Sequence, residues 1–275
     1  HGLLRRQRQM CIRDRSDSLL SILLGIIQGL TEFLPISSSA HLLFPNLIFG
    51  TNDLGLSFDI AVHFGTLIAV IFYFKEDISL MLQSLATRNS TFPREKKLFG
   101  LLVVATIPIV LVGFGVSDIL EQRLFNTFTI ALSNIVFAIL LLLVFLQRKE
   151  NLRLVDLTFK AALIIGIFQC FALIPGASRS GTAITGAILI GLTLKDSAKF
   201  AFLLSIPTIL GALVFLISDI NEISLNYSTM IIGFFTSMLF AFFTIKYFLA
   251  FVDKIGMIPF VVYRLILGIV LLALL

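Results

Sequence analysis

Long hydrophobic runs separated by short polar stretches dominate the chain. A helix needs about 20 residues to cross a bilayer core of about 30 Å. Several runs are long enough, and they cover residues 57–74, 98–117, 127–147, 200–218, 228–248 and 258–275. Because irregular backbone cannot face lipid, and because the alternation of a membrane barrel is absent, we predict that these runs are transmembrane helices.

Two further hydrophobic segments are interrupted near their middle by a polar motif. They cover roughly residues 18–45 and 161–192, and each contains a proline with neighbouring serine or glycine. Proline removes a backbone donor and disfavours helix in the residue before it. Non-helical backbone at membrane depth is tolerated only where it is buried in protein or lines a wet cavity. We therefore predict that each segment is a re-entrant hairpin and that the breaks mark a functional site.

The two interruptions are copies of one motif. Pro35 and Ser38 match Pro175 and Ser178 at an offset of 140 residues, whereas the preceding Gly-x-x-Gln pattern repeats at an offset of 141. The charged groups differ between the copies. Neither copy alone therefore holds a full set of reactive side chains.

Basic residues lie in alternate loops, and this pattern predicts the orientation of the chain in the membrane. The loops near residues 75–97 and 148–160 are rich in Lys and Arg and are predicted to be cytoplasmic. Loops 46–56 and 219–227 contain neither residue and are predicted to lie outside. The two hairpins would then enter from opposite faces and meet near the midplane, as in transporters with inverted repeats.

The predicted fold is an all-α polytopic membrane protein with an inverted-topology repeat. It contains six full transmembrane helices plus two re-entrant helical hairpins. Residues 18–160 would form the first repeat and 161–275 the second, each consisting of one hairpin and three spans. Both repeats belong to one integral membrane domain.

Composition agrees with a membrane environment and argues against a nucleic-acid partner. Hydrophobic residues make up 58% of the chain and charged residues 13%, compared with about 25% charged in soluble domains. The net charge is +5, but residues 1–15 hold five Arg and one Asp and so account for most of it. We expect residues 1–17 to be a disordered or non-native basic tail outside the fold.

The first break carries a carboxylate. Gln28 and Glu32 are spaced i, i+4 and so lie on one helix face. A carboxylate at membrane depth is costly unless it is paired, liganded or in contact with water, and such residues are functional candidates. Glu32 could bind a divalent metal, act as a base or orient His41. The structural alternative is a hydrogen bond to unwound backbone.

Ser37, Ser38, Ser39 and His41 follow the first proline. Serines beside a break often satisfy freed backbone groups, and we favour that role for Ser37 and Ser39. Ser38 differs because the repeat singles it out. His41 is a candidate nucleophile or proton donor. Its alternative is an interfacial histidine bonded to a headgroup or a carbonyl.

The second break is the strongest local signal. Its candidate phosphate-binding residues are Gly176, Ser178, Arg179, Ser180 and Gly181. The glycines allow close backbone approach, the serines supply hydroxyls, and the Arg fork suits bidentate binding of phosphate. The helix that follows would favour an anion at its amino terminus. The alternative, a snorkelling Arg, is weakened by the apolar sequence on both sides.

Asp59 and His63 form another i, i+4 pair, at the start of the first full span. We expect a supporting pair behind the reacting groups, or a simple internal hydrogen bond, rather than direct catalysis. Together, the two breaks would bring a carboxylate, a histidine and serines against an anion-binding loop. This combination predicts a phosphorylated lipid substrate and hydrolysis of its phosphoanhydride.

At these residues the chain resembles the undecaprenyl-diphosphate phosphatase family, also known as the bacitracin-resistance family. The resemblance covers residues 18–275 and has two signatures, Glu/Gln-x-x-x-Glu at 28–32 and Pro-Gly-x-Ser-Arg-Ser-Gly at 175–181. By position it assigns functional roles to a set of five residues: Glu32, Ser38, His41, Ser178 and Arg179. Gln28 takes the permitted alternative at the first acidic position, so a metal site here would have one carboxylate fewer.

The resemblance implies removal of the terminal phosphate from undecaprenyl diphosphate, the polyprenyl lipid that carries cell-wall precursors. It also implies a divalent metal, Mg or Ca, a homodimer, and a site facing the extracytoplasmic side of the bacterial cytoplasmic membrane. Whether His41 or Ser38 attacks phosphorus stays open. The competing hypothesis is a flippase or transporter for a phosphorylated polyprenyl lipid, which the inverted repeat suits equally well.

Overall fold

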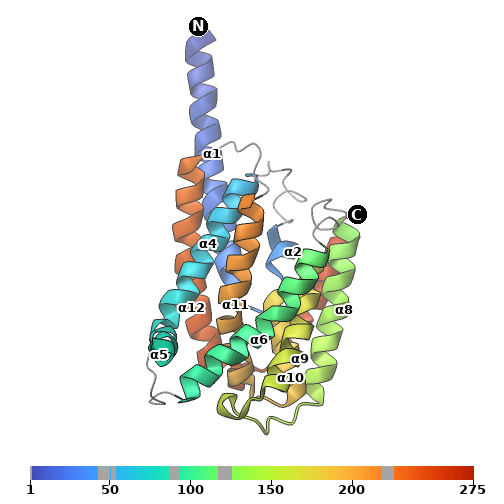
Figure 1. Cartoon of the computed structure of the whole chain (residues 1–275). Helices are drawn as coiled ribbons and strands as arrows, with labels where there is room; N and C mark the ends of the chain where they lie inside the picture. Colours follow the sequence, from blue (N-terminus) through green and yellow to red (C-terminus); the bar gives the residue numbers. More distant parts are fainter. Residues whose placement is uncertain (1, 43–49, 51–53, 87–92, 117–125, 219–225) are drawn as a thin grey trace.

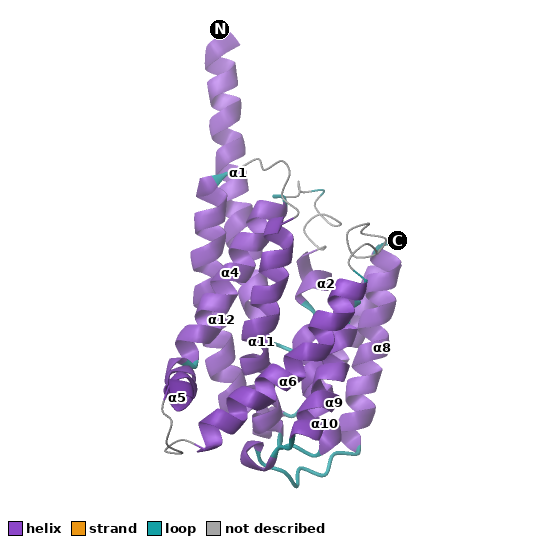
Figure 2. Cartoon of the chain, in the orientation of Figure 1, coloured by secondary structure: helices purple, strands orange, loops and turns teal. Residues whose placement is uncertain are grey.

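The structure, a computed structural model, describes residues 2–42, 50, 54–86, 93–116, 126–218 and 226–275. Its α-helices are α1 (Gly2–Thr31), α2 (Ser38–Leu42), α4 (Leu56–Tyr73), α5 (Lys75–Ala86), α6 (Pro93–Gly115), α8 (Thr127–Leu146), α9 (Phe159–Cys170), α10 (Arg179–Ile190), α11 (Leu194–Ser218), α12 (Tyr227–Ile255) and α13 (Ile258–Ala273). Two short 3-10 helices are η1 (Leu154–Asp156) and η2 (Phe171–Leu173). Among the described residues the β-pairing is limited to one isolated bridge, and the fold is otherwise helical (Figure 2).

Five helices in the described part are long and apolar enough to cross a membrane, namely α4, α6, α8, α11 and α12. They correspond to the first five predicted runs. The sixth run forms α13, which is apolar but has only 16 residues, a rise of about 24 Å. Length alone therefore does not make α13 a full span. The all-helical, multi-pass membrane architecture predicted from the hydrophobic pattern is confirmed.

Helix α1 differs from the prediction at its amino-terminal end. The structure continues this helix back to Gly2, and its first turns project beyond the rest of the molecule (Figure 1). The segment predicted from the sequence to be a disordered or non-native basic tail, residues 1–17, is helical from Gly2 onward. The stretch is rich in Leu, Arg, Gln and Met, which are good helix formers, and it contains no proline.

Both predicted breaks are present. After α1, residues 32–36 form turns, and Ser37 adopts a φ of 69° immediately before α2. After η2 the chain turns again, and Ser178 adopts a φ of 73° immediately before α10. Positive φ in a serine is strained, and such strain gathers at functional sites.

The backbone of the two breaks revises the register of the repeat by one residue. Ser37 and Ser178 hold the same position, each with positive φ before a helix, and they are 141 residues apart. Counting from the prolines predicts that Ser38 pairs with Ser178. The second copy has one residue more between its proline and its helix than the first copy has, so this pairing shifts by one. Ser38 therefore corresponds to Arg179.

Close helix packing holds the segments that lead into the breaks. Helix α12 packs along α1 and α4, whereas α6 packs along α9, and α11 contacts both groups (Figure 1). A Cβ added at Gly29 of α1 would lie 2.6 Å from the Ser237 carbonyl oxygen of α12. One added at Gly166 of α9 would lie 2.3 Å from the Ala105 carbonyl oxygen of α6. Small residues at such crossings are the usual means by which membrane helices pack.

Replacing Gly166 with alanine should therefore destabilise the protein. We expect Gly166→Ala to lower the free energy of unfolding by about 1–3 kcal/mol, because the new methyl meets backbone that must move. Gly211→Ala is the matched control, since a Cβ there meets nothing within 4 Å. The control should raise stability by about 0.5–1 kcal/mol through the lower backbone entropy of alanine. Thermal unfolding in detergent measures both, and equal effects would contradict the packing argument.

Candidate active site

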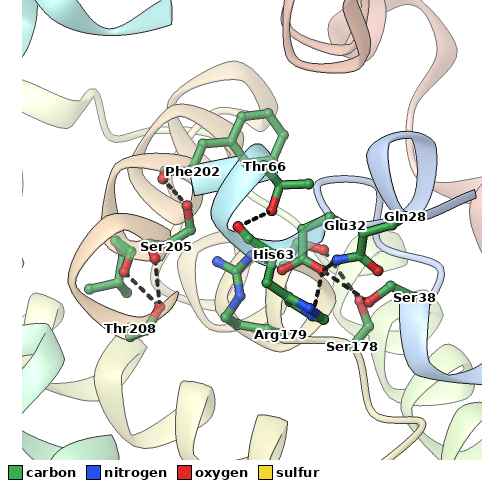
Figure 3. A network of polar contacts seen from close by, with 12 residues as sticks. Gln28, Glu32, Ser38, His63, Thr66, Ser178, Arg179, Phe202, Ser205 and Thr208 are labelled. Carbon is green, nitrogen blue, oxygen red and sulfur yellow. Dashed lines mark hydrogen bonds and ion pairs between the residues drawn. The ribbon is translucent and has the colours of Figure 1, made fainter. Parts of the chain in front are cut away.

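An ion pair joins the two breaks. Glu32 lies directly after α1 and Arg179 is the first residue of α10, and Nη2 of Arg179 donates to Oε1 of Glu32 over 2.6 Å (Figure 3). The side chains are only 7% and 15% exposed. A buried carboxylate is tolerated when it is paired and its remaining lone pairs accept hydrogen bonds. The predicted meeting of the acidic and basic copies of the motif is seen directly in this contact.

The second oxygen of Glu32 is also fully engaged. Its Oε2 accepts from Nε2 of Gln28 over 2.8 Å and from Oγ of Ser38 over 3.0 Å. Nε2 of His63 lies 3.9 Å from the same atom. Figure 3 shows these side chains converging on the carboxylate from α1, α2 and α4. The serine hydroxyl closest to the carboxylate is thus that of Ser38.

Helix α10 begins at Arg179, so its amino-terminal turn lies next to the ion pair. Ser178 caps the helix, with its Oγ accepting from the amide of Gly181 over 3.2 Å. The amide of Thr182 makes the first intrahelical bond, to the Ser178 carbonyl. The amides of Arg179 and Ser180 fall in the first turn, where a helix offers no carbonyl partner. Such amides, together with the helix dipole, bind anions.

Other polar groups of the second break bond within the protein. The hydroxyl of Ser180 donates to the Leu34 carbonyl over 2.8 Å, and the amide of Gly176 donates to Oγ of Ser39 over 3.3 Å. The sequence analysis predicted phosphate contacts for Ser180, Gly176 and Gly181. In the structure Ser180 and Gly176 tie the two breaks together, and the amide of Gly181 serves the helix cap.

A cavity of about 240 Å³ lies where the breaks meet. Its polar wall contains Glu32, Ser37, Ser38, Ser39, His63, Ser178, Arg179 and Thr208. Its apolar wall contains Ala172, Ile174, Ile209, Ala212 and Leu213. Ile174, one of these apolar residues, is 38% exposed. The cavity lining thus combines an ion pair with apolar side chains.

His41 lies behind this cavity rather than in its wall. Its Nδ1 is 2.7 Å from the Ser37 carbonyl oxygen and its Nε2 is 2.7 Å from the Tyr263 hydroxyl. A carbonyl only accepts, so Nδ1 donates to it, and Nε2 of the neutral ring accepts from Tyr263. Both ring nitrogens are thus occupied within the protein.

His63 is the histidine that lines the cavity. Its Nδ1 donates to the Asp59 carbonyl over 2.8 Å, which directs Nε2 towards Glu32. The predicted relation between Asp59 and His63 is therefore made through the backbone of Asp59. A hydrogen bond at the start of α4, one of the two alternatives for this pair, orients an imidazole at the site.

Comparison with known proteins identifies the family. A family model described as bacitracin resistance protein BacA matches residues 21–270. The chain belongs to this family. It is 44% identical over 260 residues to the undecaprenyl-diphosphatase of Alcanivorax borkumensis, covering 93% of this chain and 98% of that protein. It is 43% identical over 255 residues to the undecaprenyl-diphosphatase of Saccharophagus degradans, covering 92% and 96%. The family resemblance drawn from the two signatures is confirmed.

Arg264, which was not among the residues predicted from the sequence, contacts the second break. It lies on α13 with 0% exposure, and its Nη2 donates to the carbonyl oxygens of Gly176 and Ala177, each over 3.0 Å. Its Nε donates to Oδ1 of Asn134 over 2.7 Å. The sequence does contain a sign of its importance. Arg264 lies inside a predicted span, and a charged residue at membrane depth is a functional candidate.

The metal that the family resemblance implies can be tested against the donors present. The described residues contain no group of three or more His, Cys, Asp or Glu that could hold an ion alone. Glu32 is the one carboxylate among the cavity-lining residues. Oε1 of Gln28 is buried without a hydrogen-bond partner in the described structure, and Mg and Ca accept amide oxygens. Gln28 does not line the cavity and directs its Nε2 at Glu32, so the cavity itself offers one carboxylate, and a cation bound there would take its remaining ligands from phosphate and water.

Breaking the ion pair from one side should cost more stability than removing it altogether. Arg179→Met leaves the Glu32 carboxylate buried and unpaired, and we expect it to lower the free energy of unfolding by about 3 kcal/mol. The double variant Glu32→Gln with Arg179→Met should recover about half of that loss or more, because no unpaired charge remains.

Asp77 and Lys199 provide the control for this comparison. Their atoms are also 2.6 Å apart, but the side chains are 33% and 32% exposed. Lys199→Met should cost about 0–1 kcal/mol, as is usual for solvent-screened pairs. Chemical denaturation in detergent compares the three variants with the wild type. A double variant at the site no more stable than Arg179→Met would show that the pair is not the buried contact described above.

Proposed function

We propose that the chain is an integral membrane phosphatase that hydrolyses undecaprenyl diphosphate to undecaprenyl phosphate and inorganic phosphate, recycling the lipid carrier for cell-wall synthesis. The observation that supports this most is the Glu32 and Arg179 pair at the polar end of a cavity whose other wall is apolar. The relatives named undecaprenyl-diphosphatase, which match nearly the whole chain, support the same activity.

The cavity suggests how a lipid diphosphate binds. The two phosphates would occupy the polar end, held by the Arg179 guanidinium and by the amides at the start of α10. The prenyl chain would leave along Ile174, Ile209 and Ala212, which line the apolar wall. An anionic head and a hydrocarbon tail therefore each meet a surface of matching chemistry.

Substrate binding would separate Glu32 from its ion-pair partner Arg179. In the structure Arg179 donates to Glu32, but a diphosphate offers more charge and more acceptor oxygens to the same guanidinium. As Arg179 turns to the phosphates, the carboxylate loses its cationic partner and becomes a better acceptor for the proton of Ser38, whose Oγ already donates to it over 3.0 Å. The charge of the substrate thereby activates the nucleophile.

The reaction then proceeds in two displacements. Oγ of Ser38 attacks the terminal phosphorus and passes its proton to Glu32, while the bridging P–O bond breaks and the prenyl monophosphate leaves. A water molecule next attacks the phosphoserine, and Oγ leaves with a proton returned through Glu32. Arg179 and the α10 amides stabilise the negative charge on the transferring phosphoryl group in both steps. Mg or Ca held by Glu32 would supply further neutralisation of the phosphates.

Trapping the phosphorylated enzyme tests the identity of the nucleophile. We expect acid-stable phosphoserine at Ser38, because Ser38 lines the cavity beside its base whereas His41 has both nitrogens occupied. Rapid quenching with labelled substrate followed by peptide mapping identifies the residue, and Ser38→Ala is the negative control. Acid-labile phosphohistidine at His41 would reverse the assignment.

A detergent assay tests the function itself. Detergent solution has no two compartments, so phosphate release there requires catalysis and not transport. The wild-type protein should release phosphate from undecaprenyl diphosphate, and Arg179→Ala should lower kcat by at least about 100-fold, since it removes the main charge facing the transferred group. Absence of wild-type release would favour the flippase or transporter hypothesis, and an Arg179→Ala variant of normal rate would discard the phosphate clamp.

We also propose the finer topology given by the sequence. Asp17–Thr31 and Phe159–Leu173 are apolar but shorter than a span, and each leads into a break, which supports two re-entrant hairpins. With α13 counted as a short sixth span, the arrangement is an inverted repeat in the bacterial cytoplasmic membrane. The site would face the extracytoplasmic side, and the protein would act as a homodimer, as the family resemblance implies.

A further inference from the structure

We propose that Tyr263 and Arg264, adjacent residues of α13, are positioning residues that hold one break each and so set the geometry between them. Tyr263 acts on the first break through His41. Arg264 acts directly on the second break. This inference rests on the proposed phosphatase activity, and it assigns His41 a positioning role in place of a chemical one.

The contact with the first break passes through the His41 ring. The Tyr263 hydroxyl is 2.7 Å from Nε2 of His41, and the two rings are parallel to within 5°. Nδ1 of the same ring holds the carbonyl of Ser37, the residue with a strained φ of 69°. That carbonyl belongs to the peptide that joins Ser37 to Ser38. The phenol thus fixes, through one imidazole, the backbone that presents the Ser38 hydroxyl to Glu32.

The contact with the second break is made by one nitrogen of a guanidinium group. Nη2 of Arg264 donates to the carbonyls of Gly176 and Ala177, which immediately precede the Ser178 cap of α10. Asn134 on α8 fixes the guanidinium group in turn, because its Oδ1 accepts from Nε of Arg264 and its Nδ2 donates to the Arg264 carbonyl over 3.0 Å. A lysine offers a point charge and could not reproduce this planar set of donors. Arg264 thus fixes the peptides that aim Arg179 and the α10 amides at the cavity.

The two residues act at a distance from the chemistry. Neither Tyr263 nor Arg264 is among the residues that line the cavity. A fully buried guanidinium carries a desolvation cost that simple packing would avoid with a hydrophobic residue. Nη2 of Arg264 bonds the second break, whereas the Tyr263 hydroxyl acts on the first break through His41. Because Arg179 on the second break would both bind and stabilise the phosphates, Arg264 should affect KM and kcat, whereas Tyr263 should affect kcat alone.

Tyr263→Phe removes only the phenol hydroxyl. We expect kcat for phosphate release to fall about tenfold, the effect of losing one buried hydrogen bond, while KM stays within twofold because the phosphate loop is untouched. The matched control is Tyr247→Phe on α12, where the side chain is 54% exposed, and it should match the wild type. If Tyr263→Phe turns over at the wild-type rate, or faster because His41 is freed to react, the positioning role fails.

Arg264→Lys should give a different signature. We expect KM to rise about tenfold and kcat to fall by a similar factor, because the loop that binds the phosphates and aims Arg179 loses its fixed carbonyls. Affinity for farnesyl methylenediphosphonate, a diphosphate analogue that cannot be hydrolysed, should fall by the same factor for Arg264→Lys and stay unchanged for Tyr263→Phe. Thermal unfolding of each variant shows whether it is folded.

The outcomes separate this inference from the proposed function. If both variants change kcat and KM together in proportion to a lower melting temperature, α13 has a merely structural role and the inference is overturned. If the wild type releases no phosphate, the proposed function fails, and analogue binding by the two variants still decides whether Arg264 and Tyr263 act on separate breaks.

Discussion

Backbone polar groups in apolar surroundings need partners, and the two breaks in this chain obtain theirs from each other and from the helices packed against them. An unpaired amide or carbonyl in hydrocarbon costs several kcal/mol. Here the Leu34 carbonyl accepts from Ser180, and the Gly176 amide donates to Ser39. Ser133 of α8 donates to the Pro175 carbonyl. The two breaks thus share polar contacts, and the site is built from both halves of the chain.

The shared contacts explain why charge is divided between the halves. Glu32 alone would be a buried anion and Arg179 alone a buried cation, and each is tolerated because the other break supplies its partner. The pair is also exchangeable, since a substrate with several anionic oxygens can take the guanidinium from the carboxylate. Under the proposed function, the interaction that stabilises Glu32 and Arg179 is the one that a bound phosphate would replace.

The sequence predicted the membrane helices, both breaks and their contact, because hydrophobic length, proline and intramembrane charge act locally and can be counted. The predicted pairing of Ser38 with Ser178 was wrong by one residue. The pairing was counted from the prolines, whereas the backbone conformation pairs Ser37 with Ser178. The helical continuation of α1 to Gly2 differed as well, because low hydrophobicity alone does not decide between helix and coil.

His41 and His63 also show what sequence spacing could not predict at the site. His41 and His63 each bond a backbone carbonyl four residues earlier, so sequence spacing treats them alike. Only the long-range contact of His41 with Tyr263, 222 residues away, turns it from the cavity. Arg264 stands out in the sequence as an arginine inside a predicted span, but its partners on the second break do not, because they are backbone carbonyls that any residue could provide.

The amide of Gln28 affects the net charge around Glu32 and Arg179. Its Nε2 donates to Glu32 over 2.8 Å. A carboxylate in its place would put two negative charges in contact, which would have to share a proton or a cation. With the amide, one carboxylate faces one guanidinium and the resting pair carries no net charge. An anionic headgroup would therefore approach an ion pair without net charge. It would meet the Gln28 amide where a second carboxylate would repel it.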